Sequence, residues 1–404
     1  EWYLRSAEAG SGRAMGNLAW CYEHSKGVEQ DYPEAARLYL RAAEQDYPRG
    51  QLCMGFCCER GRGVPLDPSA AADWYRKAAE QEDEDAQCCL GFLYESGQGV
   101  EQSWEEAVRW YRAAAEQGMP RAQCNLAWCY EYGKGVEQNW KRAVHWYRQA
   151  ADQEDPRGMF CMGICCKYGR GVEQNWEEAV HWYRRAVDAG SAAAMCNLGV
   201  CYERGEGVER DAAEAARLYR QAAEREDAAA QCNLGYLYET GEGVEQNWQE
   251  AVRWYQAAAE QGYPRAQCNL GVCWEFGHGV AKDPAKAADL YRQAAEGGDR
   301  VAACNLGYLY ETGVGVAQSW ADAVKWYRQA VEESEPRAQY NLAWCYEHGK
   351  GVPRDLRQAR ELYQAAAKQG YAGAQEAADR MEKDGSRRRG GGFLRGFLDG
   401  LRGQ

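Results

Sequence analysis

Histidine and cysteine are two side-chain types here whose chemistry could support catalysis or metal binding. The five histidines are His24, His145, His181, His278 and His348. They do not have the spacing of a metal site or of a catalytic triad. The sequence also has no Gly-x-Ser-x-Gly and no His-Glu-x-x-His motif. We therefore predict that the chain is not an enzyme, and we expect no catalytic residue, no metal and no cofactor.

The eighteen cysteines form the second chemical feature of the sequence. No Cys-x-x-Cys motif has a matching partner motif, so a zinc site is not expected. All the cysteines fall within predicted helices of one kind, and two thiols on one helix are poorly placed for the narrow geometry of a disulfide. We interpret them as reduced thiols that pack as small apolar residues. This use of cysteine favours a reducing compartment and predicts a cytoplasmic location.

A 36-residue repeat positions these side chains. The dipeptide Gly-Val begins at residues 27, 63, 99, 135, 171, 207, 243, 279, 315 and 351, always 36 apart. Repeat positions carry the residue numbers of the first copy, so that Gly27 and Gly63 both occupy position 27. Ten copies in one register predict a solenoid built from one unit rather than a globular fold with one central core.

Each unit contains two predicted helices. Small or apolar residues at positions 14, 18, 21 and 22 form one face of a helix with a 3.6-residue period, which we name helix A. Glycine at position 25 in nine copies, with Ser25 the exception, predicts the left-handed conformation that ends a helix. Asp, Asn or Ser at position 31 of every copy predicts the N-cap of a second helix, helix B.

The loop between the two helices also permits a phosphate-binding interpretation, because Gly-x-Gly turns hold phosphates in some folds. No strand precedes the loop, however, and the ordinary end of helix A explains the glycines in every copy. The valine at position 28, present in all ten copies, is expected to anchor the loop to the core.

The whole pattern resembles the Sel1-like repeat family, which is related to the tetratricopeptide repeats. The likeness is carried in one copy by Ala230, Asn233-Leu234-Gly235, Tyr238, Gly241-Glu242-Gly243-Val244, Ala251, Trp254-Tyr255 and Ala258-Ala259. It covers about nine tenths of the chain. The resemblance implies an all-α fold, a right-handed α-solenoid of ten 36-residue helix-turn-helix repeats with helix A on the concave side. It also implies work as an adaptor or scaffold.

The expected domain organisation follows from the register. Residues 1–11 match the second half of a unit and form a partial repeat with helix B only. Ten full repeats occupy 12–371, and a polar capping helix over 372–384 ends the stacking. An Arg- and Gly-rich amphipathic tail covers 385–404.

The tail carries an apolar stripe, because Phe393, Phe397 and Leu401 are spaced by four residues. One interpretation is weak docking to a membrane surface or to a partner through 393–401. The alternative is a flexible end, since two glycines within this segment disfavour a helix.

Composition narrows the range of partners. The formal net charge is −13, and an acidic solenoid repels phosphate backbones, so nucleic acid is not an expected partner. No apolar run approaches the ~20 residues needed to cross a bilayer, so no integral membrane segment is expected.

A binding surface is predicted on the arc of helix A that faces away from the core. Position 20 is apolar or aromatic in every copy, where a solvated face would carry Lys and Glu. Position 17 is Asn in seven copies, and an amide can bond both the N–H and the C=O of an extended peptide. Position 13 is Arg in six copies and could bind carboxylates. The candidate residues are Asn125, Asn197, Asn233, Asn269, Asn305, Asn341, Trp128, Tyr236, Tyr308, Trp344, Arg121 and Arg265.

Each of these three positions also has a structural interpretation. Neighbouring helices A could cover the residues at position 20, and each Asn could tie two repeats together. The arginines could pair with the glutamate found at position 23 in nine copies, and we favour this pairing over carboxylate capture. An acid near a helix C-terminus opposes the helix dipole and is expected to have a partner.

The sequence thus predicts a non-enzymatic scaffold or adaptor that binds protein or peptide partners on the concave face. Glu1 aligns with position 37, inside a helix B, which suggests that sequence precedes it. The alternative is therefore a regulatory interaction module of a larger enzyme or effector whose catalytic domain lies upstream of residue 1.

Overall fold

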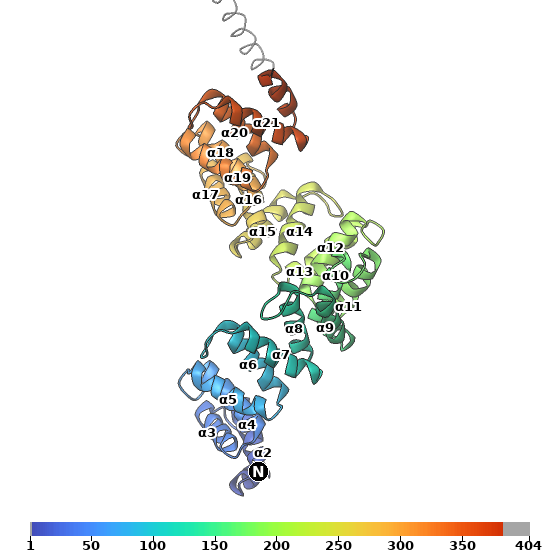
Figure 1. Ribbon diagram of the computed structural model, residues 1–404, viewed down its shortest axis with the longest axis vertical. Coiled ribbons are helices and arrows are strands. Elements are labelled where there is room, and N and C mark those ends of the chain that lie inside the picture. The colour runs from blue at the N-terminus through green and yellow to red at the C-terminus, as the bar shows by residue number, and fades with distance from the viewer. Residues whose placement is uncertain (1, 383–404) are drawn as a thin grey trace, which may run out of the picture. The chain divides into compact units, whose positions relative to one another are not determined.

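The computed structural model describes residues 2–382, and this part of the chain contains helices and no strand. Helices A and B alternate along the chain and lie side by side, joined by short loops (Figure 1). The chain divides into two units, Glu1–Arg210 and Asp211–Gln404. The prediction of an all-α solenoid of 36-residue repeats is confirmed.

Even-numbered helices are helices A and odd-numbered helices are helices B. The first unit contains α1 (Trp2–Glu8), α2 (Gly12–Glu23), α3 (Tyr32–Ala43), α4 (Pro48–Arg60), α5 (Pro68–Glu80), α6 (Glu84–Ser96), α7 (Trp104–Glu116), α8 (Pro120–Tyr132), α9 (Trp140–Asp152), α10 (Pro156–Tyr168), α11 (Trp176–Asp188) and α12 (Ala192–Arg204). The second unit contains α13 (Ala212–Ala223), α14 (Ala228–Thr240), α15 (Trp248–Glu260), α16 (Pro264–Phe276), α17 (Pro284–Glu296), α18 (Arg300–Thr312), α19 (Trp320–Glu332), α20 (Pro336–His348) and α21 (Leu356–Lys368).

Helix B begins at position 31 and helix A ends at position 25, as the sequence predicts. The position-31 side chain accepts a backbone N–H at the start of every full-length helix B; Asp31, for example, accepts from Glu34 N at 2.9 Å. The nine glycines at position 25 have φ between 64° and 81°, and Ser25 has φ 53°. Glycine adopts this left-handed conformation without the steric cost that other residues have, so helix A ends there.

The interface between helices A and B is made of small residues around a tyrosine. The tyrosine at position 39 is at most 2% exposed in all ten repeats. Its ring lies so close to helix A that a Cβ on Gly55 would sit 2.4 Å from the ring of Tyr75. Only glycine or alanine occupies this position 19 of helix A, which explains the Asn-Leu-Gly motif as a packing requirement.

Each helix A also packs on the helix B that precedes it, and this contact joins one repeat to the next. The loop glycine at position 27 belongs to this contact. A Cβ on Gly351 would lie 2.2 Å from the backbone oxygen of Trp320 in the preceding repeat. The loop therefore sits on the neighbouring repeat, and any larger residue would push the two apart.

A further helix covers 374–382, inside the segment 372–384 for which a polar capping helix is predicted. Its Ala377 and Ala378 are buried against the last full repeat, beside Trp344. Arg380 on its outer side forms an ion pair with Glu347 at 2.9 Å. The predicted tail over 385–404 and its docking segment 393–401 lie outside the described residues.

Candidate binding surface on helices A

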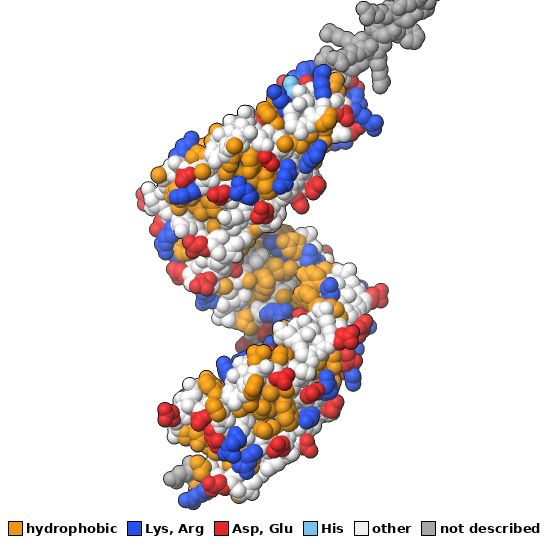
Figure 2. All heavy atoms as spheres, turned by 90° about the vertical axis from the view of Figure 1, so that its left-hand side faces the viewer, with side chains coloured by type: hydrophobic (Ala, Val, Ile, Leu, Met, Phe, Trp, Pro, Cys, Tyr) orange, Lys and Arg blue, Asp and Glu red, His pale blue; other side chains and the backbone are white. Residues whose placement is uncertain are grey.

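Aromatic side chains at position 20 lie on the solvent side of helices A. Tyr236 on α14 is 45% exposed and Tyr308 on α18 is 48% exposed, while Trp20 and Phe92 are 47% and 39% exposed. The hydroxyls of Tyr236 and Tyr308 make no hydrogen bond with other described residues. Figure 2 shows hydrophobic side chains gathered in patches between acidic and basic ones on the face that it draws. We call the seven aromatic residues at position 20 the outer aromatic row: Trp20, Phe56, Phe92, Trp128, Tyr236, Tyr308 and Trp344.

Two of the three tryptophans of this row, Trp128 and Trp344, are half-buried. The ring of Trp128 packs at a tilt against Trp104 of the preceding helix B, with ring centroids 5.7 Å apart. Trp344 stacks on Trp320 at 5.6 Å and on His348 at 4.3 Å. Both tryptophans are covered in part by the first residue of the preceding helix B. Trp344 also packs against the cluster that contains Ala377 and Ala378 of the helix at 374–382.

The asparagines at position 17 are also half-buried, and several of them join adjacent repeats. Asn125 accepts a hydrogen bond from Arg157 of the next repeat at 2.8 Å. Asn269 donates to the Cys232 sulfur at a long 3.8 Å.

Asn197 differs, because its amide donates to the backbone oxygen of Ala193 in its own helix at 3.0 Å. Asn233 and Asn341 occupy the same position on α14 and α20. The interpretation of the asparagines as ties between repeats therefore holds for part of the set.

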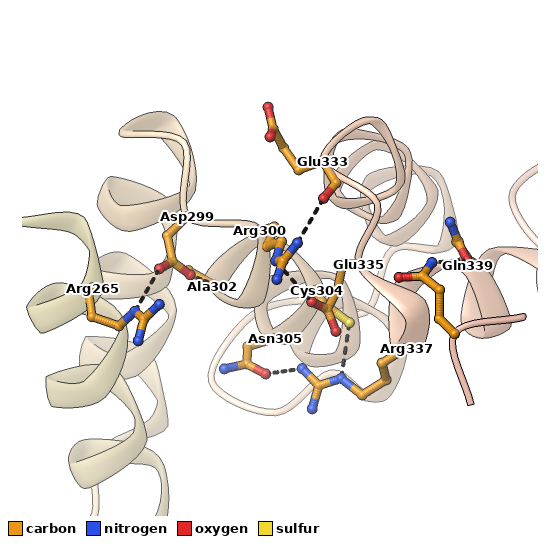
Figure 3. Close-up of polar contacts among 11 residues, drawn as sticks. Arg265, Asp299, Arg300, Ala302, Cys304, Asn305, Glu333, Glu335, Arg337 and Gln339 are labelled. Carbon is orange, nitrogen blue, oxygen red and sulfur yellow. Dashed lines mark hydrogen bonds and ion pairs between the residues drawn. The ribbon is translucent and has the colours of Figure 1, made fainter. Parts of the chain in front are cut away.

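Figure 3 shows one such contact in detail. Arg337 on α20 donates through Nε to the Cys304 sulfur at 3.1 Å and through Nη2 to the Asn305 side-chain oxygen on α18. Asn305 in turn donates to the Cys268 sulfur at 3.9 Å. The amides at position 17 and the thiols at position 16 thus meet at the interface between helices A.

The two candidate arginines at position 13 are exposed. Arg265 is 71% exposed and lies 3.9 Å from the Asp299 carboxylate, which caps α18 (Figure 3). Arg121 forms no hydrogen bond or ion pair with any described residue. Both guanidinium groups are therefore open to solvent at the edge of the outer aromatic row.

The expected pairing of these arginines with the glutamate at position 23 is wrong. In eight repeats that glutamate accepts a hydrogen bond from the buried tyrosine at position 39 of the same repeat, at 2.5–3.0 Å. The acid does have a partner, as its place near a helix C-terminus predicts, but that place does not identify the partner. The tyrosine hydroxyl is the partner of this glutamate because it is buried beside the carboxylate and would otherwise have no acceptor.

One repeat lacks this bond. Position 23 is Lys167 in the repeat at 156–191, and the hydroxyl of Tyr183 is buried there without a hydrogen-bond partner. The Lys167 ammonium lies over the ring of Trp176 at 5.6 Å instead. This repeat therefore shows the position-39 tyrosine without a glutamate acceptor, for comparison with the eight repeats that have the bond.

A ladder of buried glutamines was missed by the sequence analysis. The glutamine at position 15 is buried in six repeats, and Gln123, for example, donates to the backbone oxygen of Ala115 at 3.2 Å. Its own oxygen accepts from Gln153 at position 45, at 3.0 Å. The available signal was covariation, because position 45 is Gln in five of the six repeats that have Gln at position 15.

The cysteines are core residues rather than reactive groups. All eighteen thiols are free, and burial raises the pKa of Cys53 to about 11 and the pKa of Cys161 to about 12. Such thiols stay protonated and are poor nucleophiles. Within residues 2–382, no three His, Cys, Asp or Glu side chains gather as they would around a metal ion. The same part of the chain has no helix with the length and apolar character of a membrane span.

These features define a class of protein first: an α-helical repeat protein with an exposed aromatic row. The Sel1 repeat family model matches residues 1–11, 12–47, 48–83, 84–119, 120–155, 156–191, 192–227, 228–263, 264–299, 300–334 and 336–371. The chain belongs to the Sel1 repeat family, whose solenoids are protein-interaction folds.

Two solved structures are similar to this chain. One is c5321, a protective antigen of uropathogenic Escherichia coli with an SLR fold, at 34% identity and a TM-score of 0.72, covering 95% of this chain and 82% of that one. The other is a Sel1 repeat protein from Oxalobacter formigenes at 33% identity and a TM-score of 0.56, covering 60% of this chain and 96% of that one. A comparison with curated protein sequences found no match.

Proposed function

We propose that the protein is a non-enzymatic scaffold or adaptor that binds protein or peptide partners through the outer aromatic row. The observation that carries the proposal is the exposure of Tyr236 and Tyr308, whose hydroxyls have no partner within the described part of the chain. Aromatic side chains are enriched in protein interfaces because they bury a large area at a small cost in side-chain entropy. Two exposed tyrosines at one repeat position therefore favour a partner over a solvated face.

Polar groups beside the row support the binding of extended peptide. The side-chain amides of Asn269 and Asn305 donate hydrogen bonds to cysteine sulfurs at 3.8 and 3.9 Å. Sulfur is a weak acceptor, so a peptide carbonyl can replace it at little cost. Arg121 and Arg265 add exposed guanidinium groups that can bind carboxylates of the partner.

The net charge and the free cysteines bear on the kind of partner and on the compartment. The net charge of −13 disfavours nucleic acid as a partner. The eighteen free thiols favour a reducing compartment, and hence the cytoplasm.

Site-specific photocrosslinking in the native cell tests the proposal. A photoreactive phenylalanine derivative replaces Tyr308 in one variant and Arg253 in another; Arg253 lies on α15, a helix B, and is 65% exposed. We expect a discrete protein adduct from position 308 and none from position 253. The same adducts from both positions, or none from position 308, would show that the outer aromatic row is not the partner surface.

A further inference from the structure

A pocket of about 440 Å³ lies on a different surface, between the helices B of the second unit. It is formed by α15, α16 and α17, and its lining includes Ala259, Leu270, Trp274 and Leu290. No residue of the outer aromatic row takes part. Its volume falls within the range of ~300–1,000 Å³ that is typical of small-ligand sites.

The first cause of the pocket is the residue at position 38, which is Trp in six repeats and Leu in four. In the next repeat, Trp326 is 6% exposed and lies in one buried cluster with Ala295 and Leu306. These two residues are the equivalents of Ala259 and Leu270 in the pocket. The indole of Trp326 thus fills the place that is open beside Leu290.

The second cause is a missing bridge. In five repeats the Arg at position 40 donates a hydrogen bond to the Tyr hydroxyl at position 22 of the next repeat, as Arg328 does to Tyr346 at 2.9 Å. At the pocket these two positions are Gln256 and Trp274, which cannot form the bridge. Gln256 donates instead to Glu260 in its own helix, at 3.1 Å.

Leucine at position 38 does not open a pocket by itself. Leu38 and Leu218 are buried, at 2% and 1% exposure, whereas Leu290 is partly exposed. Leu362 is also partly exposed, but the bridge from Arg328 to Tyr346 crosses the gap beside it. At Leu290 a side chain smaller than Trp at position 38 and the loss of the bridge occur together.

We propose that this pocket binds the indole side chain of a tryptophan carried by a protein or peptide partner. The equivalent place is filled by an indole of this chain itself in the next repeat. Trp274 forms an aromatic wall, and the carboxylates of Glu260 and Asp289 lie in the lining, where they can accept the N–H of an incoming indole. The inference does not rest on the outer aromatic row, because the two surfaces share no residue.

The test measures binding of N-acetyl-tryptophanamide to the full chain by ligand-observed NMR. Replacing Leu290 by Trp supplies the side chain that six other repeats carry at this position and should weaken binding by about tenfold or more. The matched control is Leu362→Trp, a change of the same type at the same position of another repeat, which should leave binding unchanged.

Two further measurements test the pocket independently. Gln256→Arg with Trp274→Tyr restores the bridge and should also reduce binding, so the result does not depend on how well Leu290→Trp folds. N-acetyl-leucinamide should bind more weakly than N-acetyl-tryptophanamide. Equal binding of the two probes, binding that survives both sets of substitutions, or no binding at millimolar probe would overturn the proposal.

Discussion

The repeats carry two rows of aromatic side chains, one buried in the core and one exposed to solvent. The tyrosines at position 39, the inner row, are buried between helices A and B, and Tyr327 donates its hydroxyl to Glu311 at 2.6 Å. The outer aromatic row lies at position 20 of helices A, where Tyr308 is 48% exposed and its hydroxyl makes no hydrogen bond with other described residues. Tyr308 and Tyr327 belong to the same repeat and are the same residue type, so their difference comes from their surroundings alone.

This difference separates stability from binding. A buried tyrosine contributes packing and one hydrogen bond to a charged acceptor, and both are lost on truncation. An exposed tyrosine contributes little to folding and retains its whole apolar face for a partner. Changes in the inner row should therefore affect the fold, and changes in the outer aromatic row should affect partner binding.

Raising the pH should have the largest effect, because it ionises the inner row. Burial raises the pKa of Tyr327 and Tyr255 above the ordinary value of about 10. A raised pKa in the folded state means that stability is complete below pH ~10 and is lost as the pH rises further. We expect cooperative loss of helix above this pH, followed by circular dichroism in reducing buffer. Phenolate formation by the inner row with the helices intact would contradict this expectation.

Truncation within one repeat should show the contrast most clearly. Tyr327→Ala leaves a cavity in the core and should lower the free energy of unfolding by about 3–5 kcal/mol. Tyr308→Ala should change it by no more than ~0.5 kcal/mol. Urea unfolding of the two variants measures both values, and similar losses would remove the distinction between the rows.

Removing only the hydroxyl should give a smaller effect. Tyr327→Phe leaves the Glu311 carboxylate without its donor and should cost about 1–3 kcal/mol. The matched control is Tyr183→Phe, because the Tyr183 hydroxyl is buried with no partner, and this variant should be as stable as the natural protein or more so. A cost for Tyr183→Phe as large as that for Tyr327→Phe would mean that the hydrogen bond is not the source of the difference.

The smallest change should come from supplying the missing acceptor. Lys167→Glu places at position 23 the residue found in nine other repeats. The new hydrogen bond from Tyr183 should stabilise the protein by about 1 kcal/mol. Hydrogen exchange of α10 and α11 would report the gain locally. Faster exchange in these helices would show that the contact of Lys167 with Trp176 matters more than the restored bond.

The sequence predicted the elements of the fold well because their signals are local. Asp31 and its equivalents cap helix B through a bond to a backbone N–H three residues away, and Gly61 ends helix A through its own conformation. Such features depend on neighbours in the chain. The period of 36 residues then fixed the order of the helices.

Contacts between elements were predicted less well. The helical wheel placed Glu311 correctly near the end of helix A, but it could not show that Tyr327, sixteen residues away, meets it. It also could not show that Asn125 would accept from Arg157 in the next repeat. The first pair depends on how the two helices of one repeat pack, and the second depends on the offset between neighbouring repeats. The pocket beside Leu290 was missed for the same reason, since it needs residues from two repeats.

The most direct test of the central claim is the affinity of the double variant Tyr236→Ala/Tyr308→Ala for the partner captured through position 308. We predict that the variant binds this partner at least about tenfold more weakly, while its free energy of unfolding stays within ~0.5 kcal/mol of the natural protein. Undiminished affinity in this variant, or a loss of affinity matched by an equal loss of stability, would contradict the assignment of the outer aromatic row to partner binding.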